Sequence, residues 1–229
     1  MAARREDPLA RYRRMRDFDR TPEPSGEDTT LAPSDRRRFV VHRHRATRLH
    51  HDLRLELDGV LVSWAVPKGM TLDPDVRRLA VHVEDHPLDY FDFEGVIGAG
   101  AYGGGDVIVW DWGWWEPAGD DPAADLAKGS LHVDLFGVRL SGRYALARRG
   151  TERGKEQWIV IHKHDDAARP GWDPEDHLTS VASGRTNDEV HAADGAPPTK
   201  AQLYAVARQR GVRGRSTMTR DELAGALRP

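Results

Sequence analysis

The stretch that decides the fold runs from residue 42 to residue 57 and reads HRHRATRLHHDLRLEL. Between residues 49 and 57, leucines alternate with polar residues, and this period of two predicts a β-strand with one apolar face. The polar face carries an imidazole, a carboxylate and a guanidinium in a row, from His50, Asp52 and Arg54. Because imidazole and carboxylate suit a divalent metal and guanidinium suits a phosphate oxyanion, the stretch predicts a metal beside a phosphate.

The composition fits one sizeable folded domain with small appendages. The chain has 229 residues, of which 38% are hydrophobic and 31% charged, so a packed core and long solvated segments are both expected. It has no cysteine, which excludes disulfides and thiolate metal sites and fits the cytoplasm. No apolar run approaches the roughly 20 residues of a membrane helix, and the N-terminus lacks the apolar core of a secretory signal. We therefore expect a cytoplasmic protein with no membrane partner.

Charge is distributed unevenly along the chain. The net charge is −3, but residues 1–55 carry 14 Lys and Arg against 9 Asp and Glu, and residues 200–229 carry 7 against 2. Basic ends on an acidic body are suited to binding a polyanion, although basic tails are also common as solvated segments. Charge alone therefore admits nucleic acid as a partner without requiring it.

Four segments are predicted from the residue pattern. Residues 1–35 suggest a short helix and an irregular arm, residues 36–165 a mainly β body, residues 166–198 a polar linker, and residues 199–229 two helices. Short strands with Gly-rich turns are typical of a barrel or a sandwich. The candidate strands span 38–44, 48–57, 60–66, 78–84, 105–111, 130–135, 139–147 and 156–163.

Local signals fix several turns and helix ends. Asp58-Gly59 lies between two alternating runs and predicts a hairpin turn. A short helix is expected near residues 122–127. In the C-terminal unit, the segments 199–202 and 219–222 both fit a capping box, and Gly211 is a natural end for the first helix. Two helices of about ten residues each are marginally stable without a partner.

The spacing His44-x5-His50-x-Asp52 is the candidate metal site. If His44 comes from the preceding strand of a hairpin, it lies beside His50 and Asp52. Two neutral imidazoles and one carboxylate leave open positions for water and substrate, as a catalytic site requires. The alternative interpretation is a solvated polar strand face.

A second constellation lies in the segment RLAVHVEDHP, residues 78–87. Arg78, Glu84 and His86 share one parity, and Pro87 is expected to end the strand just after His86. His86 then suits a general acid or base, or a phosphate contact. Lys68, at the end of another strand, offers a point charge for a phosphate, although most lysines are simply solvated.

Other patterns are set aside. The segment GVIGAGAYGGG, residues 95–105, lacks the GK[ST] ending of a nucleotide-binding loop. Four tryptophans in residues 110–115 suit base stacking, but a role in the core is favoured. A cupin-like metal barrel is not cleanly matched, because no glutamate follows the His42-x-His44 pair at the right distance. No serine occurs in a nucleophile-elbow pattern, so a Ser-His-Asp hydrolase is poorly supported.

At these residues the chain resembles the 3′-phosphoesterase module of bacterial and archaeal DNA ligase D, which serves non-homologous end joining. The resemblance covers roughly residues 8–165. The matching segments are RDF (16–18), TPEPSG (21–26), FVVHRH (39–44), LHHDLRLELDG (49–59), SWAVPKG (63–69), RLAVHVEDHPLDY (78–90), FEG (93–95) and YGG (102–104).

The resemblance implies a compact β-barrel with a few flanking short helices and a crescent-like groove. It implies a metal-dependent enzyme, typically with manganese and with zinc or cobalt as alternatives, that removes a 3′-ribonucleoside and then the 3′-phosphate. By motif position, the metal ligands are His44, His50 and Asp52. The catalytic and phosphate-contacting residues are His86, Arg54, Lys68, Arg78, Tyr90 and Glu84. The supporting residues are Arg16, Asp17, Glu23 and His42.

This chain departs from the family pattern at three positions. The family usually has glutamine at His42, an aromatic residue at His51 and proline at Gly98. His42 shares a face with His44, so we expect it to add a ligand or to alter the metal preference. Without a Lys-x-Asp-Gly adenylation motif, the chain is expected to be a stand-alone end-processing protein associated with the nucleoid.

The C-terminal 30 residues resemble small helix–extended–helix modules of the SAP or Rho-N kind, which often bind nucleic acid. The expected partners are DNA 3′ ends, together with a DNA ligase or polymerase and Ku. Two alternatives stay open. One is a non-catalytic adaptor that binds DNA ends, and the other is a small-molecule metalloenzyme whose substrate binding would not depend on salt.

Overall fold

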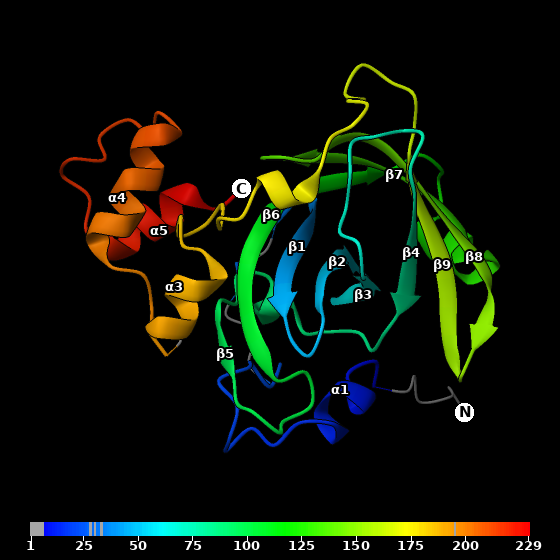
Figure 1. The fold of residues 1–229 in the computed structure, drawn as a ribbon, viewed down its shortest axis with the longest axis horizontal. Helices are drawn as coiled ribbons and strands as arrows, with labels where there is room; N and C mark the ends of the chain where they lie inside the picture. Colours follow the sequence, from blue (N-terminus) through cyan, green and yellow to red (C-terminus); the bar gives the residue numbers. More distant parts are fainter. Residues whose placement is uncertain (1–6, 28, 30, 33, 195) are drawn as a thin grey trace.

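The computed structural model describes residues 7–27, 29, 31–32, 34–194 and 196–229, so the first six residues of the predicted N-terminal arm lie outside the described part. A nine-stranded antiparallel sheet runs in the order β1-β2-β3-β4-β9-β8-β7-β6-β5, and β1 also pairs with β6. Eight strands therefore close into a barrel, which confirms the predicted mainly β fold (Figure 1). The strands are β1 (Arg37–Arg45), β2 (Leu49–Leu57), β3 (Val60–Val66), β4 (Arg77–His82), β5 (Gly95–Ile97), β6 (Gly105–Pro117), β7 (Ser130–Gly137), β8 (Ser141–Glu152) and β9 (Lys155–His162).

The turns set the strand register on which the site depends. Asp58 and Gly59 both have positive φ, at 50° and 84°, so they form the two-residue turn expected between β2 and β3. In the β1–β2 hairpin, His44 lies opposite His50. Because directly opposite residues in an antiparallel pair have adjacent side chains, this register brings the two imidazoles together.

The barrel strands bury apolar side chains on both faces. The inner face of β2 contributes Leu53 and Leu55 to a large core that also contains Trp64 and Trp110. The outer face of β1, β3 and β6 is covered by a second cluster, which includes Tyr12, Val40, Leu61, Tyr90 and Trp112. Residues from the N-terminal segment and from the chain after β4 therefore cover the outside of β1, β3 and β6.

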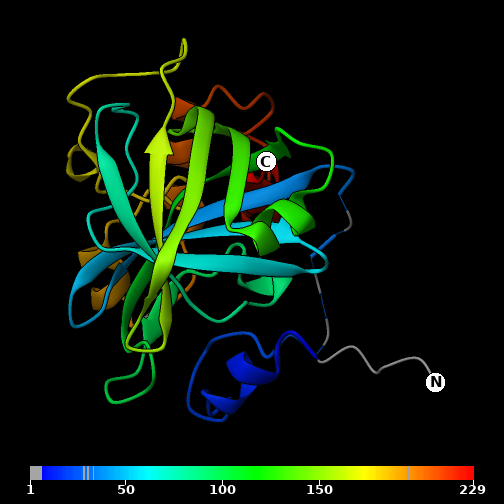
Figure 2. The ribbon, with the colours of Figure 1, turned by 90° about the vertical axis from the view of Figure 1, so that its right-hand side faces the viewer.

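Short helices surround the barrel. They are α1 (Ala10–Arg14), α2 (Pro122–Lys128), α3 (Asn187–Ala192), α4 (Lys200–Gln209) and α5 (Arg220–Leu227), with 3₁₀ turns η1 (Leu88–Tyr90) and η2 (Pro174–Asp176). Figure 2 shows α1 below the barrel, on the side of the N-terminus. Helices α4 and α5 pack on each other, and both begin with the capping boxes that the sequence predicts. In the described ranges, no helix is long and apolar enough to cross a membrane.

The segment that we expected to be a polar linker, residues 166–198, is packed against the barrel instead. Val181, Arg185 and Asn187 are buried, and the Asn187 amide donates to the main-chain oxygens of Arg43 and Asp106. Helix α3 lies beside β5 and β6 (Figure 1). The prediction failed because a few buried contacts anchor a segment whose composition is otherwise that of a loop.

Candidate metal centre

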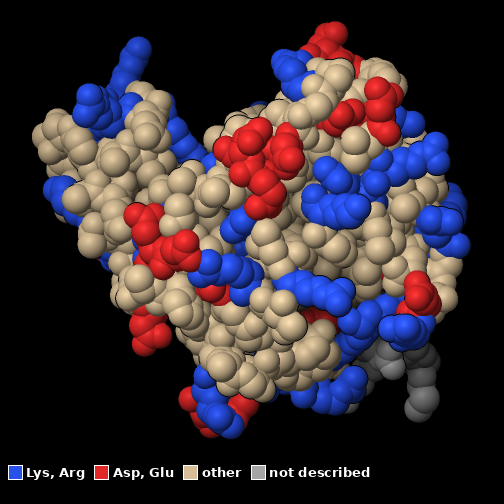
Figure 3. Space-filling view, in the orientation of Figure 1, with Lys and Arg blue, Asp and Glu red and all other residues tan. Residues whose placement is uncertain are grey.

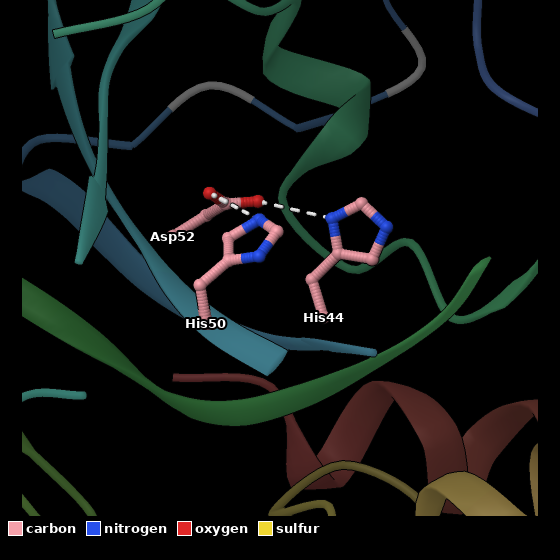
Figure 4. A group of neighbouring side chains, drawn as sticks. All are labelled: His44, His50 and Asp52. Carbon is pink, nitrogen blue, oxygen red and sulfur yellow. Dashed lines mark ion pairs between the residues drawn. The ribbon is translucent and has the colours of Figure 1, made fainter. Parts of the chain in front are cut away.

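Three side chains on the outer face of the first hairpin converge on one point. One potential ligand atom from each of His44, His50 and Asp52 lies within 4.8 Å of the others. His44 Nδ1 is 3.6 Å from Asp52 Oδ2, and His50 Nε2 is 3.4 Å from Asp52 Oδ1 (Figure 4). The parity of β2 and the register of the hairpin place these three groups together, as the sequence predicts.

The two imidazoles are held by their outer nitrogens. His44 Nε2 lies 2.8 Å from the main-chain oxygen of Gly103, and His50 Nδ1 lies 2.9 Å from that of Arg48. A carbonyl oxygen accepts a hydrogen bond, so in the neutral rings these nitrogens carry the proton. The inner nitrogens then turn lone pairs toward the Asp52 carboxylate. Lone pairs facing a carboxylate across this space fit a divalent cation, with backbone carbonyls orienting both histidines.

The carboxylate of Asp52 is buried and strongly paired. Arg54 Nη2 donates to Asp52 Oδ2 at 2.9 Å. Burial acts to raise the pKa of Asp52, but Arg54, His44 and His50 outweigh it and hold this pKa well below its ordinary value. Asp52 is therefore ionised and available as an anionic ligand.

Arg54 is fixed from three sides. Besides Asp52, it donates from Nη1 to Ser63 Oγ at 2.9 Å and from Nε to His42 Nδ1 at 3.2 Å. Three of the five N–H bonds of the guanidinium are thus used within the protein, which leaves two for a ligand. The Tyr90 ring lies under the guanidinium, at 4.8 Å from its carbon to the ring centroid.

His42 orients Arg54 and is not part of the candidate metal group, which is formed by His44, His50 and Asp52. Its Nδ1 accepts from Arg54, and its ring is fully buried with an edge-on contact to Tyr90. Burial and the adjacent Arg54 cation lower the pKa of His42 well below its ordinary value. The three-residue metal group found among the described residues does not include His42, so the expectation of an added ligand finds no support in the geometry.

His86 is held as a neutral ring beside Arg16. Its Nδ1 lies 2.9 Å from the main-chain oxygen of Glu84, and its Nε2 lies 3.2 Å from Arg16 Nη2. Nδ1 therefore carries the proton, and Nε2 accepts from the guanidinium. Burial, Arg54 and Arg16 lower the pKa of His86 well below its ordinary value. In this arrangement His86 is an acceptor that positions Arg16.

Arg16 in turn lies in a cage of carboxylates and aromatic rings. It pairs with Glu23 at 2.9 Å and with Glu84 at 3.2 Å, and its guanidinium stacks on Tyr12 at 3.8 Å. The Tyr90 hydroxyl donates to Glu23 at 3.1 Å. These side chains form one connected network, which joins the predicted supporting residues Arg16 and Glu23 to Glu84 and Tyr90 of the predicted catalytic set.

A cleft of about 920 Å³ opens over the metal group. Its inner wall includes His44, Asp52, Arg54 and His86, and the Gly-rich loop, residues 99–105, forms one side. Tyr102 of this loop is 42% exposed, and its hydroxyl donates to Glu84 at 3.4 Å. Space of this size next to a metal group accommodates a nucleotide-sized ligand.

Four of the predicted residues do not line this cleft, namely His42, Lys68, Arg78 and Asp17, and of these His42 contacts the lining residue Arg54. Lys68 is exposed after β3. Arg78 has the parity of Ala80, which belongs to the inner core, so it lies on the other face of the sheet. Asp17 is exposed and caps its own turn by accepting from the Asp19 amide.

The wrong placement of Arg78 has a simple cause. We expected one strand to run from residue 78 to residue 84, with the same face continuing to His86. Instead β4 ends at His82, and the chain turns so that His86 pairs with Leu61 in an isolated bridge. The parity rule holds within a strand and fails beyond its end.

Sequence reasoning missed Ser63 and Tyr12. Ser63 accepts from Arg54, and Tyr12 stacks on Arg16 with its ring edge against His86. The signal for Ser63 was present, because a two-residue turn at Asp58-Gly59 places it opposite Arg54. No sequence signal marked Tyr12, whose contact with the barrel depends on the path of the N-terminal segment.

Comparisons with known proteins identify a family for the region that holds this site. Residues 42–148 match the model of the family described as the DNA ligase D 3′-phosphoesterase domain. The multifunctional non-homologous end joining protein LigD of Pseudomonas aeruginosa is 56% identical over 162 residues, which cover 71% of this chain and 19% of the relative. The multifunctional non-homologous end joining DNA repair protein LigD of Mycobacterium tuberculosis is 50% identical over 149 residues, 64% of this chain and 19% of the relative.

A third relative, LigD of Mycolicibacterium smegmatis, is 43% identical over 172 residues, which cover 72% of this chain and 22% of the relative. The chain thus spans about a fifth of the length of these curated relatives. The matched region holds strands β2 to β7 and the three side chains of the candidate metal group.

Proposed function

Since residues 42–148 belong to the DNA ligase D 3′-phosphoesterase domain family, we propose that this protein is a metal-dependent hydrolase that repairs DNA 3′ ends for non-homologous end joining. Its substrates would be a 3′-terminal ribonucleoside, removed to leave a 3′-phosphate, and then that phosphate, removed to leave a 3′-hydroxyl. The observation that carries the proposal is the group of His44, His50 and Asp52 directly beside Arg54 in one cleft.

The donor set fits a divalent metal of borderline character. We propose manganese, with zinc and cobalt as alternatives, held by His44, His50 and Asp52. When bound there, such an ion supplies Lewis-acid polarisation of a phosphoryl oxygen and lowers the pKa of a coordinated water.

The protein's own side chains would orient the phosphate. Arg54 directs its two unused N–H bonds at the phosphate, and its charge offsets negative charge on the equatorial oxygens. His86 and Glu84 hold Arg16 in place at the same wall. Because Arg16 is paired with two carboxylates and Arg54 with one, these two cations are already largely compensated. A phosphate here therefore depends on the additional charge of a metal.

Tyr102 is suited to the nucleoside that carries the phosphate. The main-chain oxygen of the next residue, Gly103, accepts from His44, so Tyr102 is adjacent in the chain to a residue that orients one of the candidate metal ligands. Stacking on an aromatic ring tolerates every base, as a 3′-end enzyme requires, because every base has a π face.

The C-terminal unit, residues 199–229, is proposed to bind DNA. Its charge of seven Lys and Arg against two Asp and Glu suits a phosphate backbone. A DNA ligase or polymerase and Ku are also proposed as partners, because their names place the relatives in non-homologous end joining.

The decisive experiment is a primer–template assay whose primer ends in a single 3′-ribonucleotide, run with manganese and with EDTA. We expect stepwise conversion to a 3′-phosphate and then a 3′-hydroxyl, with loss of both steps in His50→Ala. The matched control is His132→Ala, which removes an exposed histidine on β7. If no metal among manganese, zinc and cobalt supports conversion while DNA binding stays intact, the protein is a non-catalytic end-binding adaptor.

A further inference from the structure

The outer half of the β8–β9 hairpin stands clear of the barrel. Strands of a barrel normally alternate between buried and exposed residues. In β8 this alternation stops, and every residue from Ala147 to Glu152 is exposed. Because both faces of the ribbon are exposed at its tip, the side chains there do not contribute to the core and are available to contact a partner.

Four cations occupy this ribbon, and three of them, Arg149, Arg153 and Lys155, form no ion pair among the described residues. Arg149 stands at a register irregularity of the β8–β9 ladder, between Arg148 and Gly150, where a bulge redirects a side chain. Arg153 and Gly154 form the tip with positive φ, at 50° and 76°, and Lys155 follows. The fourth cation, Arg148, pairs with Glu156.

The tip of the ribbon borders the cleft over the metal group. Lys155 lines this cleft together with Arg48, an exposed residue of the β1–β2 turn. Figure 3 shows Lys and Arg side chains gathered on the side of the barrel where β8 and β9 lie in Figure 1. Lys155 therefore lies at the edge of the cleft, and Arg153 and Arg149 lie further along the same hairpin.

From this placement we propose that the tip of the β8–β9 hairpin binds the phosphodiester backbone of the strand whose 3′ end occupies the cleft. The proposal rests on the proposed function, because it takes the occupant of the cleft to be a nucleic-acid 3′ end. Arg149, Arg153 and Lys155 would each contact a phosphate upstream of the terminal nucleotide, without reading the sequence.

The test is a triple variant, Arg149→Ala, Arg153→Ala and Lys155→Ala, compared with wild type in binding to a primer–template that ends in a 3′-hydroxyl. Each phosphate contact adds about 0.7 to 0.9 to the slope of log K against log salt. We therefore expect the slope of the triple variant to be shallower by about 2 to 3. The matched control removes three exposed cations away from the cleft, Lys128→Ala, Lys163→Ala and Arg169→Ala, and should keep the wild-type slope.

Kinetics separate this inference from the proposed function. The double variant Arg149→Ala and Arg153→Ala, which keeps the cleft-lining Lys155, should keep the wild-type kcat/KM on a dinucleotide with a 3′-ribonucleoside, which is too short to reach these two side chains, and should lose at least tenfold on a 16-nucleotide primer. A wild-type salt slope overturns the inference, and so does an equal loss on both substrates. A wild-type protein that cleaves neither substrate refutes the proposed function, while the salt slope still decides whether the hairpin binds the backbone.

Discussion

The two faces of strand β2 differ in whether their polar side chains have hydrogen-bond or ion-pair partners. On the outer face, His50, Asp52 and Arg54 all have partners within hydrogen-bond or ion-pair distance. On the inner face, the His51 ring packs at a tilt against Trp110, with ring centroids 4.5 Å apart, and neither of its ring nitrogens has a hydrogen-bond partner. Burial and then Arg43 lower the pKa of His51 to about 3, so its ring is neutral.

This difference shows on which face of a small barrel a polar functional site can lie. The inner face is filled by apolar side chains and supplies most of the stabilising burial. The outer face is buried too, but under a lid from the N-terminal segment and the chain after β4, and a cleft stays open beside it. A polar site therefore lies on the outside of the barrel, where it does not compete with the core.

The largest expected effect comes from Asp52→Asn. The change keeps the shape of the side chain but removes the anionic ligand, so we expect metal binding to be lost and the rate to fall about 10³-fold, since a Lewis acid contributes several kcal/mol. Arg54 also loses its carboxylate, which should lower the free energy of unfolding by about 3 kcal/mol. Titration calorimetry with manganese and urea unfolding measure the two effects. A variant that binds metal as wild type does would remove Asp52 from the site.

The neighbouring change Leu53→Ala tests the other face. Leu53 is 1% exposed within the inner core, and truncation should cost about 2–5 kcal/mol of stability through lost burial and a cavity. Because Leu53 and Asp52 point to opposite faces, the folded variant should keep its metal affinity and its kcat at a temperature well below its unfolding midpoint. Urea unfolding and the primer assay give both values. A loss of activity as large as that of Asp52→Asn would show that the two faces are not independent.

The sequence predicted more of this arrangement within the first hairpins than between distant segments. The period of two in residues 49–57 was enough to place His50 and Asp52 on one face, and a hairpin with the preceding strand brings His44 opposite His50. The position of Arg78 was wrong because parity cannot be carried past the end of a strand. The packing of residues 166–198 was missed because contacts such as that of Asn187 with Arg43 join positions far apart in the chain.

Tyr102→Ala is expected to act on binding of the terminal nucleoside. A stacking platform contributes about 1–3 kcal/mol per base, so kcat/KM on a 3′-ribonucleotide primer should fall about 10- to 100-fold. A primer that ends in an abasic ribose should be cleaved equally by wild type and variant, and Tyr102→Phe should retain the activity. If the loss on the abasic primer is as large as on the normal primer, Tyr102 acts by holding its loop or Glu84 instead.

The smallest effect is also the sharpest comparison, between two buried histidines that differ in their partners. His51→Leu replaces a ring with no hydrogen-bond partner by an apolar side chain, so the free energy of unfolding should rise by about 1 kcal/mol with activity unchanged. His42→Leu removes the acceptor of the Arg54 Nε–H bond, so stability should fall by about 1–2 kcal/mol and activity should fall with it. Urea unfolding at pH 7 and the primer assay measure both variants. If both substitutions change the free energy of unfolding in the same direction, a hydrogen-bond partner does not decide the effect of replacing a buried histidine here. The packing around each ring would then decide it.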